Sequence, residues 1–239
     1  MKTALVTGGT KGIGAGMVRM LLKRGYYVYA TYSTDDEAAD MFRRELSEHD
    51  AHYTLLKVNN AEYSQIERLT DIIKKQGYIN CLLLNAGQTL RKPLKETENK
   101  EWESNLTVNL SSNVYIIRNL YDNIAHNSRI IFMGSMMGIH PHATSLAYGV
   151  SKAAVHALAK NLVKEFEGTG TTINAIAPGF IETDWQKNKP DYIRNNICAK
   201  TALNRFGSIQ EIVKIAEMCI DNQFINGSII EVNGGYCYK

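Results

Sequence analysis

The sequence lacks a long apolar segment. A helix that spans a bilayer needs roughly 18–20 consecutive apolar residues, and no run in the 239 residues approaches that length. The segment from Met1 to Thr7 has one basic residue and a short apolar stretch before glycines begin, whereas a secretory signal needs a longer apolar stretch. We therefore expect a cytoplasmic protein with no membrane partner.

Excess charge, clustered cysteines and metal-binding spacings are also missing. The 27 basic side chains nearly balance the 24 acidic ones, giving a net charge of +3. That is too little for a nucleic-acid binder that neutralises phosphates, so we expect no nucleic-acid partner. The four cysteines form no Cys-x-x-Cys pair and are expected to be reduced thiols. His140 and His142 have no carboxylate or thiol cluster nearby, and we predict no metal site.

What is present is the composition of a folded α/β chain, with 44% hydrophobic and 21% charged residues. Short apolar runs alternate with amphipathic segments, which predicts a parallel sheet whose strands are covered on both faces. The predicted strands are Ala4–Thr7, Tyr26–Thr31, Tyr53–Val58, Ile79–Leu84, Arg129–Met133, Thr172–Ala177 and Ser228–Val232. The predicted helices are Gly14–Arg24, Glu37–His49, Tyr63–Gln76, Val108–Ala125, Ala147–Glu167 and Ile209–Asp221. We expect a single Rossmann-type, doubly wound domain over residues 1–239.

A glycine-rich segment joins the first predicted strand to the first predicted helix. It reads Thr-Gly-Gly-Thr-Lys-Gly-Ile-Gly from Thr7 to Gly14. Small residues let a pyrophosphate approach the backbone, and a helix N-terminus supplies free N–H groups and a positive dipole end. The position of the turn favours a dinucleotide site at the carboxyl ends of the strands. Its candidate contacts are Gly8, Thr10, Lys11, Gly12, Ile13 and Gly14.

Three side chains suggest acid–base chemistry. Tyr148 and Lys152 are four residues apart at the start of a predicted helix, so they lie on one face. A lysine ammonium roughly 5 Å away, at an effective dielectric of about 20, stabilises a phenolate by around 3 kcal/mol. This predicts a Tyr148 pKa lowered by about two units. Ser135 follows a predicted strand and can hold a carbonyl oxygen, while Asn109 is expected to open the preceding long helix.

The order and spacing of these features resemble the short-chain dehydrogenase/reductase superfamily over essentially the whole chain. The glycine-rich turn is followed by Asn85-Ala86-Gly87, Asn109, Ser135, Tyr148 with Lys152, and Pro178-Gly179. Within the superfamily, residues 109–112, 177–184 and 232–235 resemble the 3-oxoacyl-acyl-carrier-protein reductases. The resemblance implies an oxidoreductase that commonly assembles as a homotetramer or homodimer.

The resemblance also implies a role for each matching residue. Tyr148 would be the general acid, Lys152 would lower its pKa and bind the nicotinamide ribose, and Ser135 would orient the carbonyl. Asn109 would hold a water that relays protons to Lys152. Further cofactor contacts would come from Asn85, Ala86, Gly87, Pro178, Gly179, Ile181 and Thr183.

The second predicted strand bears on the choice of cofactor. NAD-specific sites place an acidic residue near its end, but here no carboxylate appears before Asp35. Lys11 matches a position where NADP-dependent relatives carry a basic residue, and Ser33 can add a hydroxyl donor. We therefore favour NADP(H) over NAD(H). Asn59 and Asn60 follow the third strand where many relatives have an adenine-binding aspartate, and an asparagine carbonyl can still accept.

The substrate is less well specified than the chemistry. Residues 119–128 contain no lysine or arginine, and residues 165–170 are acidic or neutral, although carrier-protein reductases tend to be basic in both places. The expected substrate loop, residues 182–205, mixes aromatic with basic side chains. A 3-oxoacyl thioester, another small ketone, a sugar or a polyol all remain candidate substrates. A non-catalytic NADP-binding regulator is the alternative, and the complete set of Asn109, Ser135, Tyr148 and Lys152 favours the enzyme.

Overall fold

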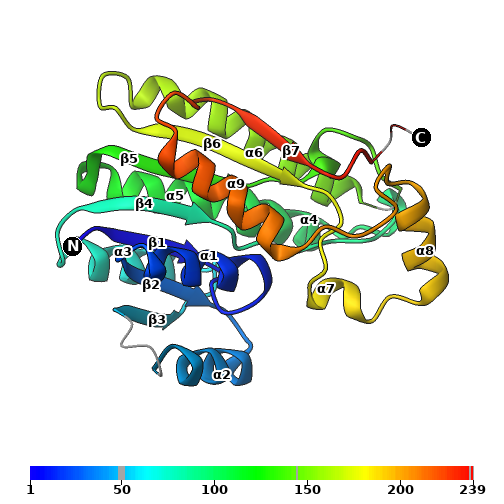
Figure 1. The fold of residues 1–239 in the computed structure, drawn as a ribbon, viewed down its shortest axis with the longest axis horizontal. Helices are drawn as coiled ribbons and strands as arrows, with labels where there is room; N and C mark the ends of the chain where they lie inside the picture. Colours follow the sequence, from blue (N-terminus) through cyan, green and yellow to red (C-terminus); the bar gives the residue numbers. More distant parts are fainter. Residues whose placement is uncertain (48–51, 144, 237, 239) are drawn as a thin grey trace.

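The centre of the protein is a sheet of seven strands in which each neighbouring pair is parallel (Figure 1). The computed structural model describes residues 1–47, 52–143, 145–236 and 238. The strands are β1 (Thr3–Thr7), β2 (Tyr27–Tyr32), β3 (Tyr53–Lys57), β4 (Ile79–Leu84), β5 (Ile124–Met133), β6 (Thr172–Pro178) and β7 (Ile229–Val232). The predicted parallel sheet is confirmed.

The strand order creates a switch point beside β1. The order across the sheet is β3-β2-β1-β4-β5-β6-β7. The chain therefore builds outward from β1 to β3, crosses to the other side of β1, and builds outward again to β7. Loops that leave β1 and β4 diverge at this point, and open α/β sheets bind ligands in such a crevice.

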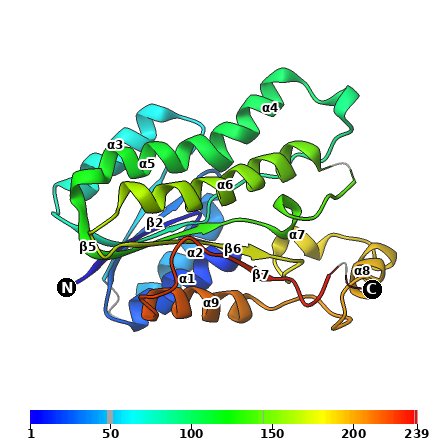
Figure 2. The same cartoon turned by 90° about the horizontal axis from the view of Figure 1, so that it is seen from above.

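Helices cover both faces of the sheet, as the turned view shows (Figure 2). On one face, an apolar cluster joins the sheet to α1 (Gly12–Lys23), α2 (Asp36–Ser47) and α9 (Ile209–Asp221). On the other, a second cluster joins it to α3 (Tyr63–Lys74), α5 (Ser112–Leu120) and α6 (Leu146–Glu165). This confirms the predicted doubly wound arrangement. The end of the predicted helix Glu37–His49 lies outside the described residues.

Strand β1 shows why the apolar runs form this sheet. Ala4 and Val6 pack into the cluster on one face, whereas Leu5 packs into the cluster on the other. All three side chains are fully buried. Neither face of β1 meets water, so an unbroken apolar run is stable here, as expected of a central parallel strand.

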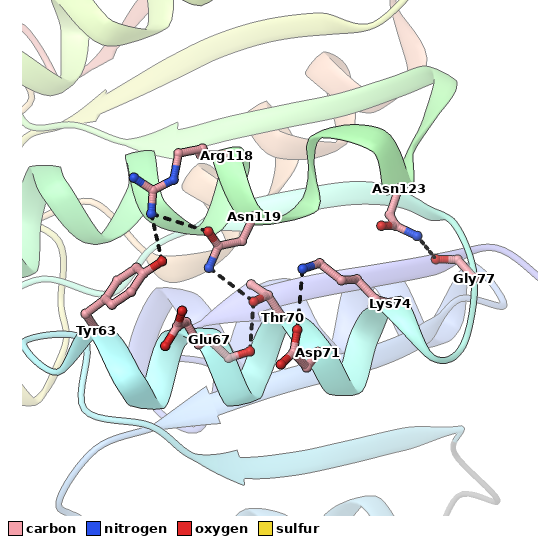
Figure 3. A network of polar contacts seen from close by, with 9 residues as sticks. All are labelled: Tyr63, Glu67, Thr70, Asp71, Lys74, Gly77, Arg118, Asn119 and Asn123. Carbon is pink, nitrogen blue, oxygen red and sulfur yellow. Dashed lines mark hydrogen bonds and ion pairs between the residues drawn. The ribbon is translucent and has the colours of Figure 1, made fainter.

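Polar contacts tie α3 to α5 at the edge of the second helical layer (Figure 3). The Arg118 guanidinium donates to the Tyr63 hydroxyl at 2.9 Å, and the Asn119 amide donates to the Thr70 hydroxyl at 3.3 Å. At the right of the figure, the Asn123 amide donates to the Gly77 carbonyl at 3.3 Å. These contacts set the spacing of the two helices on the side of the sheet that carries α6.

The long helix before β5 is placed differently from the prediction. It was expected over Val108–Ala125, but it begins nine residues earlier with α4 (Asn99–Leu106) and continues through a π-helical turn, η2 (Thr107–Ser111), into α5. A capping box between Glu98 and Glu101 starts it. In α4 only Asn105 is buried, so the segment lacks the apolar periodicity on which the prediction depended.

Strand β5 is also longer than its apolar run. It begins at Ile124, whereas the prediction began it at Arg129. The added residues include Asn127, which has a positive φ of 59°, and the pairing register with β4 shifts between Ile79 and Cys81. The Ser128 hydroxyl donates to the Ile79 carbonyl at 3.2 Å. Polar contacts therefore stabilise this part of the strand without an alternating apolar pattern.

The expected substrate loop, residues 182–205, contains two short helices. These are α7 (Asp184–Lys187) and α8 (Asp191–Ala199). Ile197 of α8 packs with Phe180, Phe206 and Met136 in a small apolar cluster that is separate from the main core. No helix within the described ranges is long and apolar enough to cross a membrane.

Candidate active site

The glycine-rich turn joins β1 to α1 in a tight loop. Gly8 adopts a positive φ of 63°, which strains any residue with a side chain. At Gly14, an added Cβ would lie 2.0 Å from the Gly8 carbonyl oxygen. The first turn of α1 carries no acidic residue, and its N-cap side chain makes no capping hydrogen bond. The helix therefore presents its amino end to the loop, and a phosphate is the ligand that such a helix end favours.

The loop after β4 is bound directly to this turn. The Asn85 amide donates to the carbonyls of Thr7 and Gly8 at 3.1 and 3.0 Å. In return, the Thr7 hydroxyl accepts from the backbone N–H groups of Asn85 and Ala86, both at 3.0 Å. These four bonds hold together the two loops that diverge at the switch point.

A cavity of about 340 Å³ opens at this edge of the sheet. It brings together most of the residues predicted for the cofactor and for catalysis. Those that line it are Gly8, Thr10, Lys11, Gly12, Ile13, Ser33, Asn85, Ala86, Gly87, Ser135, Tyr148, Lys152, Gly179, Ile181 and Thr183. The described residues Gly14, Asn59, Asn60, Asn109 and Pro178 were also predicted for the site but are not part of the lining.

Ser135, Tyr148 and Lys152 come from two neighbouring segments. Ser135 follows β5 and caps the short helix η4 (Met136–Gly138), accepting from the Met137 N–H at 3.2 Å. Tyr148 and Lys152 lie one turn apart near the start of α6. The Lys152 ammonium donates to the Met133 carbonyl at 2.7 Å and lies 5.7 Å from the centroid of the Tyr148 ring.

The acid–base balance of Tyr148 differs from the prediction. Burial raises its pKa, and the smaller opposing effects of a hydrogen bond with Ser135 and of the Arg91 charge do not reverse this. Burial also lowers the pKa of Lys152 to about 8. The predicted direction was wrong because the argument from Lys152 included attraction but not the cost of burying either charged form. At neutral pH Tyr148 therefore holds its proton and can donate it.

Asn109 lies in the π-helical turn, not at the start of the helix as predicted. Its side-chain amide donates to the Gln88 carbonyl at 3.0 Å and to the Ser151 hydroxyl at 2.9 Å, and its side-chain oxygen accepts from the Gln88 N–H at 2.8 Å. Its backbone carbonyl accepts from the Asn113 amide at 2.9 Å. Asn109 thus joins the loop after β4 to α6, which carries Tyr148.

The two asparagines after β3 are engaged elsewhere. Asn60 is buried, and its amide donates to the Ser112 hydroxyl at 3.4 Å. The Asn59 side-chain oxygen accepts from the Ala61 N–H at 3.0 Å. Neither asparagine lines the cavity, so the adenine contact expected from this pair stays a prediction.

The other end of the cavity contains a carboxylate that the prediction did not include. Asp35 lines the cavity and forms an ion pair with Lys11. The hydrogen bond from Lys11 holds the pKa of the Asp35 carboxyl below its usual value. Ser33 and Thr34 line the wall beside it. The prediction of the cofactor considered only the end of the second strand, and Asp35 lies beyond that end.

His156 is a further buried group next to the candidate catalytic residues. Its Nε2 accepts from the Ser135 backbone N–H at 3.3 Å. Burial and the nearby Lys152 charge lower its pKa to about 4, so it is a neutral acceptor that helps to place Ser135. The lone histidine in an amphipathic helix gave no signal for this contact. No cluster of metal-binding side chains occurs in the part of the chain that the structure describes.

Known proteins with similar sequences and structures agree with this geometry. A family model described as short chain dehydrogenase matches residues 2–193. The 3-oxoacyl-[acyl-carrier-protein] reductase of Salmonella typhimurium is 31% identical, and the alignment covers 98% of this chain and 96% of that protein.

Two solved structures share the fold over nearly the whole chain. One is a short-chain dehydrogenase from Burkholderia cenocepacia in complex with NADP, with a TM-score of 0.92, 22% identity and coverage of 98% of this chain and 97% of that one. The other is a blue fluorescent protein from a metagenomic library in complex with NADPH, with a TM-score of 0.92, 25% identity and coverage of 100% and 98%. From the family match and the full-length relative, we conclude that this chain belongs to the short-chain dehydrogenase/reductase family and is an oxidoreductase.

Proposed function

We propose that residues 1–239 form one catalytic domain, an NADP(H)-dependent reductase or dehydrogenase that interconverts a carbonyl group and a secondary alcohol. The observation that carries the proposal is that Ser135, Tyr148 and Lys152 line the same cavity as the glycine-rich turn. A nicotinamide cofactor supplies the hydride chemistry. The protein then needs only to bind, orient and move one proton.

The turn after β1 suits a dinucleotide pyrophosphate. A side chain at Gly14 would collide with the Gly8 carbonyl, so the loop depends on a glycine there. The amino end of α1 has no acidic residue to repel a phosphate. The loop formed by Asn85, Ala86 and Gly87 supplies the facing wall. These residues fit the cofactor, and we assign them to hold its phosphates and sugars.

The proposed mechanism assigns one task to each polar group. Tyr148 donates its phenolic proton to the carbonyl oxygen, and its raised pKa keeps that proton available at neutral pH. Ser135 donates to the same oxygen and stabilises its developing charge. Lys152 supplies a buried positive charge beside Tyr148. The side-chain atoms of Asn109 are engaged by Gln88 and Ser151, so we assign it a positioning role in place of the predicted water relay.

Lys11 supports NADP(H) as the preferred cofactor. Its ammonium lies at the end of the cavity beside Ser33 and Thr34, where cation and hydroxyl donors suit a ribose phosphate. Asp35 pairs with it and offsets part of its charge. We therefore expect a moderate preference for NADP(H) over NAD(H). The NADPH named in the complex of the 25%-identical structure is consistent with this choice.

A panel of carbonyl compounds with both cofactors tests the function. We expect turnover with NADPH at a kcat/KM about tenfold above that with NADH, as one charge-assisted contact gives. Lys11→Gln should remove most of this difference by lowering the efficiency with NADPH, because it removes the cation. The control is Lys23→Gln, an exposed lysine at the far end of α1. Higher efficiency with NADH in the unmodified protein would contradict the cofactor choice.

That panel should include an acetoacetyl thioester beside free sugars, polyols and small ketones. The 31%-identical relative is named as a 3-oxoacyl-[acyl-carrier-protein] reductase, which supports testing a thioester first. The intact cavity lining favours the enzyme over a non-catalytic regulator.

We also propose that the protein is a homotetramer or homodimer. Apolar side chains are exposed on the two long helices, with Val114 of α5 at 36% and Leu146 and Val150 of α6 at 46% and 41%. Burial of such a surface stabilises association. Light scattering at micromolar concentration should give two or four times the chain mass of 26.8 kDa. A monomer would contradict the proposal.

A further inference from the structure

One cation in the cavity has neither an ion pair nor a hydrogen bond with a residue that the structure describes. The charged side chains in the lining are Lys11, Asp35, Arg91, Lys152 and Asp184. Of these, Lys11 pairs with Asp35, Asp184 pairs with Lys187 at 2.5 Å, and Lys152 donates to the Met133 carbonyl. The Arg91 guanidinium has no hydrogen bond or ion pair with any described residue.

Arg91 lines the same cavity as the proposed proton donor Tyr148. It is in the loop that follows β4, two residues after Thr89, and both residues are in the lining with Tyr148. Burial raises the pKa of Tyr148. The hydrogen bond with Ser135 lowers this pKa, and the Arg91 charge lowers it by a smaller amount. The Arg91 charge therefore acts on the proposed proton donor from within the same cavity.

A second cation, Lys189, lies beside the cavity wall, since its backbone N–H donates to the carbonyl of Gln186, a lining residue, at 3.1 Å. Burial is the main cause of the lowered pKa of Lys189, and the charges of Arg91 and Arg194 lower it further. Arg194 is neutralised by Glu182 at 2.5 Å, but Lys189 has no carboxylate partner among the residues that the structure describes. Two cations that repel each other without a counter-ion favour binding of an anion between them.

Gln186 provides an independent sign of an unfilled ligand position. Gln186, in α7, is 7% exposed and lines the cavity. The Gln186 side-chain oxygen is buried without a donor among the described residues. A buried acceptor without a partner is costly, and a hydroxyl group on a bound molecule would satisfy it.

We propose that the physiological substrate is a carbonyl compound that also carries a carboxylate or phosphate, and that Arg91, assisted by Lys189, binds this anionic group while the carbonyl lies at Ser135 and Tyr148. This inference rests on the proposed reductase function and names its substrate class. Gln186 then accepts from a hydroxyl of the same substrate.

The test compares pairs of substrates that share the carbonyl and differ in whether they carry an anionic group. Suitable pairs are 3-oxobutanoate with its methyl ester, for a carboxylate, and dihydroxyacetone phosphate with dihydroxyacetone, for a phosphate. The measured quantity is the ratio of kcat/KM for the charged and the neutral member of each pair. We expect a ratio above one for at least one pair. Arg91→Gln should lower it by about tenfold or more, as loss of one charge-assisted contact does, and Lys189→Gln should lower it by less.

The controls remove the same charge nearby. Lys95→Gln alters an exposed lysine in the same connection as Arg91, and Lys200→Gln alters an exposed lysine just after α8. Neither residue lines the cavity, and both variants should retain the ratio of the unmodified protein. Equal ratios in the unmodified protein and in Arg91→Gln would overturn the proposal, as would reduction of neutral ketones alone.

A binding measurement separates this inference from the reductase function. Calorimetry can titrate 3-oxobutanoate and dihydroxyacetone phosphate into the Tyr148→Phe protein saturated with NADP⁺. If these compounds bind and the binding is lost when Arg91→Gln is added, the anion site is supported. If in addition no ketone is turned over by the unmodified protein, only the reductase function is overturned. Absence of binding together with absence of charge preference would overturn the anion site even if neutral ketones are reduced.

Discussion

Tyr148→Phe is expected to lower kcat/KM for carbonyl reduction by about 10²–10⁴-fold, the usual contribution of a positioned general acid. The substitution removes the phenolic hydroxyl and keeps the ring. Tyr148 is the proton donor in our proposal because its raised pKa holds the proton at neutral pH, and because it shares the cavity with the glycine-rich turn. Steady-state kinetics with NADPH and the best ketone of the panel measures the loss.

The control for this variant is the affinity for NADPH, followed by the fluorescence of the bound cofactor. The glycine-rich turn and the loop at Asn85 are unchanged in this variant and should still bind NADPH. Unchanged kcat/KM in Tyr148→Phe would show that another group delivers the proton.

Lys152→Met is expected to abolish turnover and at the same time to stabilise the fold at pH 7. Burial lowers the pKa of Lys152 from 10.5 to about 8. Below pH 8 the folded protein must keep a buried charge that the unfolded chain exposes to water, and the cost is on the order of 3 kcal/mol. Methionine has a similar shape without the charge. Loss of the hydrogen bond to the Met133 carbonyl offsets about 1 kcal/mol of the gain.

The pH dependence distinguishes this effect from better packing. Between pH 8 and 10.5 the unfolded chain binds more protons at this lysine than the folded protein, so the unmodified protein gains stability as pH rises. The advantage of Lys152→Met should therefore be full below pH 8 and shrink up to pH 10.5. Urea unfolding at pH 7 and pH 10 measures it, with Lys160→Met, an exposed lysine of the same helix, as the control. An advantage that does not change with pH would contradict the burial argument.

The seven parallel strands and most of the cavity residues could be predicted from the sequence because burial leaves a direct pattern there. Strand β1 is apolar on both faces since both faces are covered, and the turn after it needs glycine since Gly14 meets the Gly8 backbone. Tyr148 and Lys152 share a cavity wall because four residues make about one helical turn.

Other parts of the site depend on contacts between distant segments. Asn109 is in a π-helical turn, and its partners Gln88 and Ser151 lie 21 and 42 residues away. Asp35 reaches Lys11 across 24 residues. The direction of the Tyr148 pKa shift depends on how deeply α6 buries the phenol. No local pattern of residue types carries such information.

The proposed substrate contacts also depend on distant segments and could not be predicted from local sequence patterns. Residues 182–205 were expected to contain substrate contacts, but only the folded chain brings Arg91, from the loop after β4, into the same cavity as Gln186. The unpaired guanidinium and the unsatisfied amide oxygen are visible only once their surroundings are known. In our proposal, substrate specificity therefore depends on two separate loops of this chain.

The central claim is that Tyr148 donates the proton during hydride transfer in this cavity. Single-turnover kinetics tests it most directly, with NADPH oxidation followed by absorbance after the NADPH complex is mixed with the best ketone. We predict a rapid decay in the unmodified protein and a decay at least about 10²-fold slower in Tyr148→Phe, at equal NADPH occupancy. Equal rates in the two proteins would contradict the account.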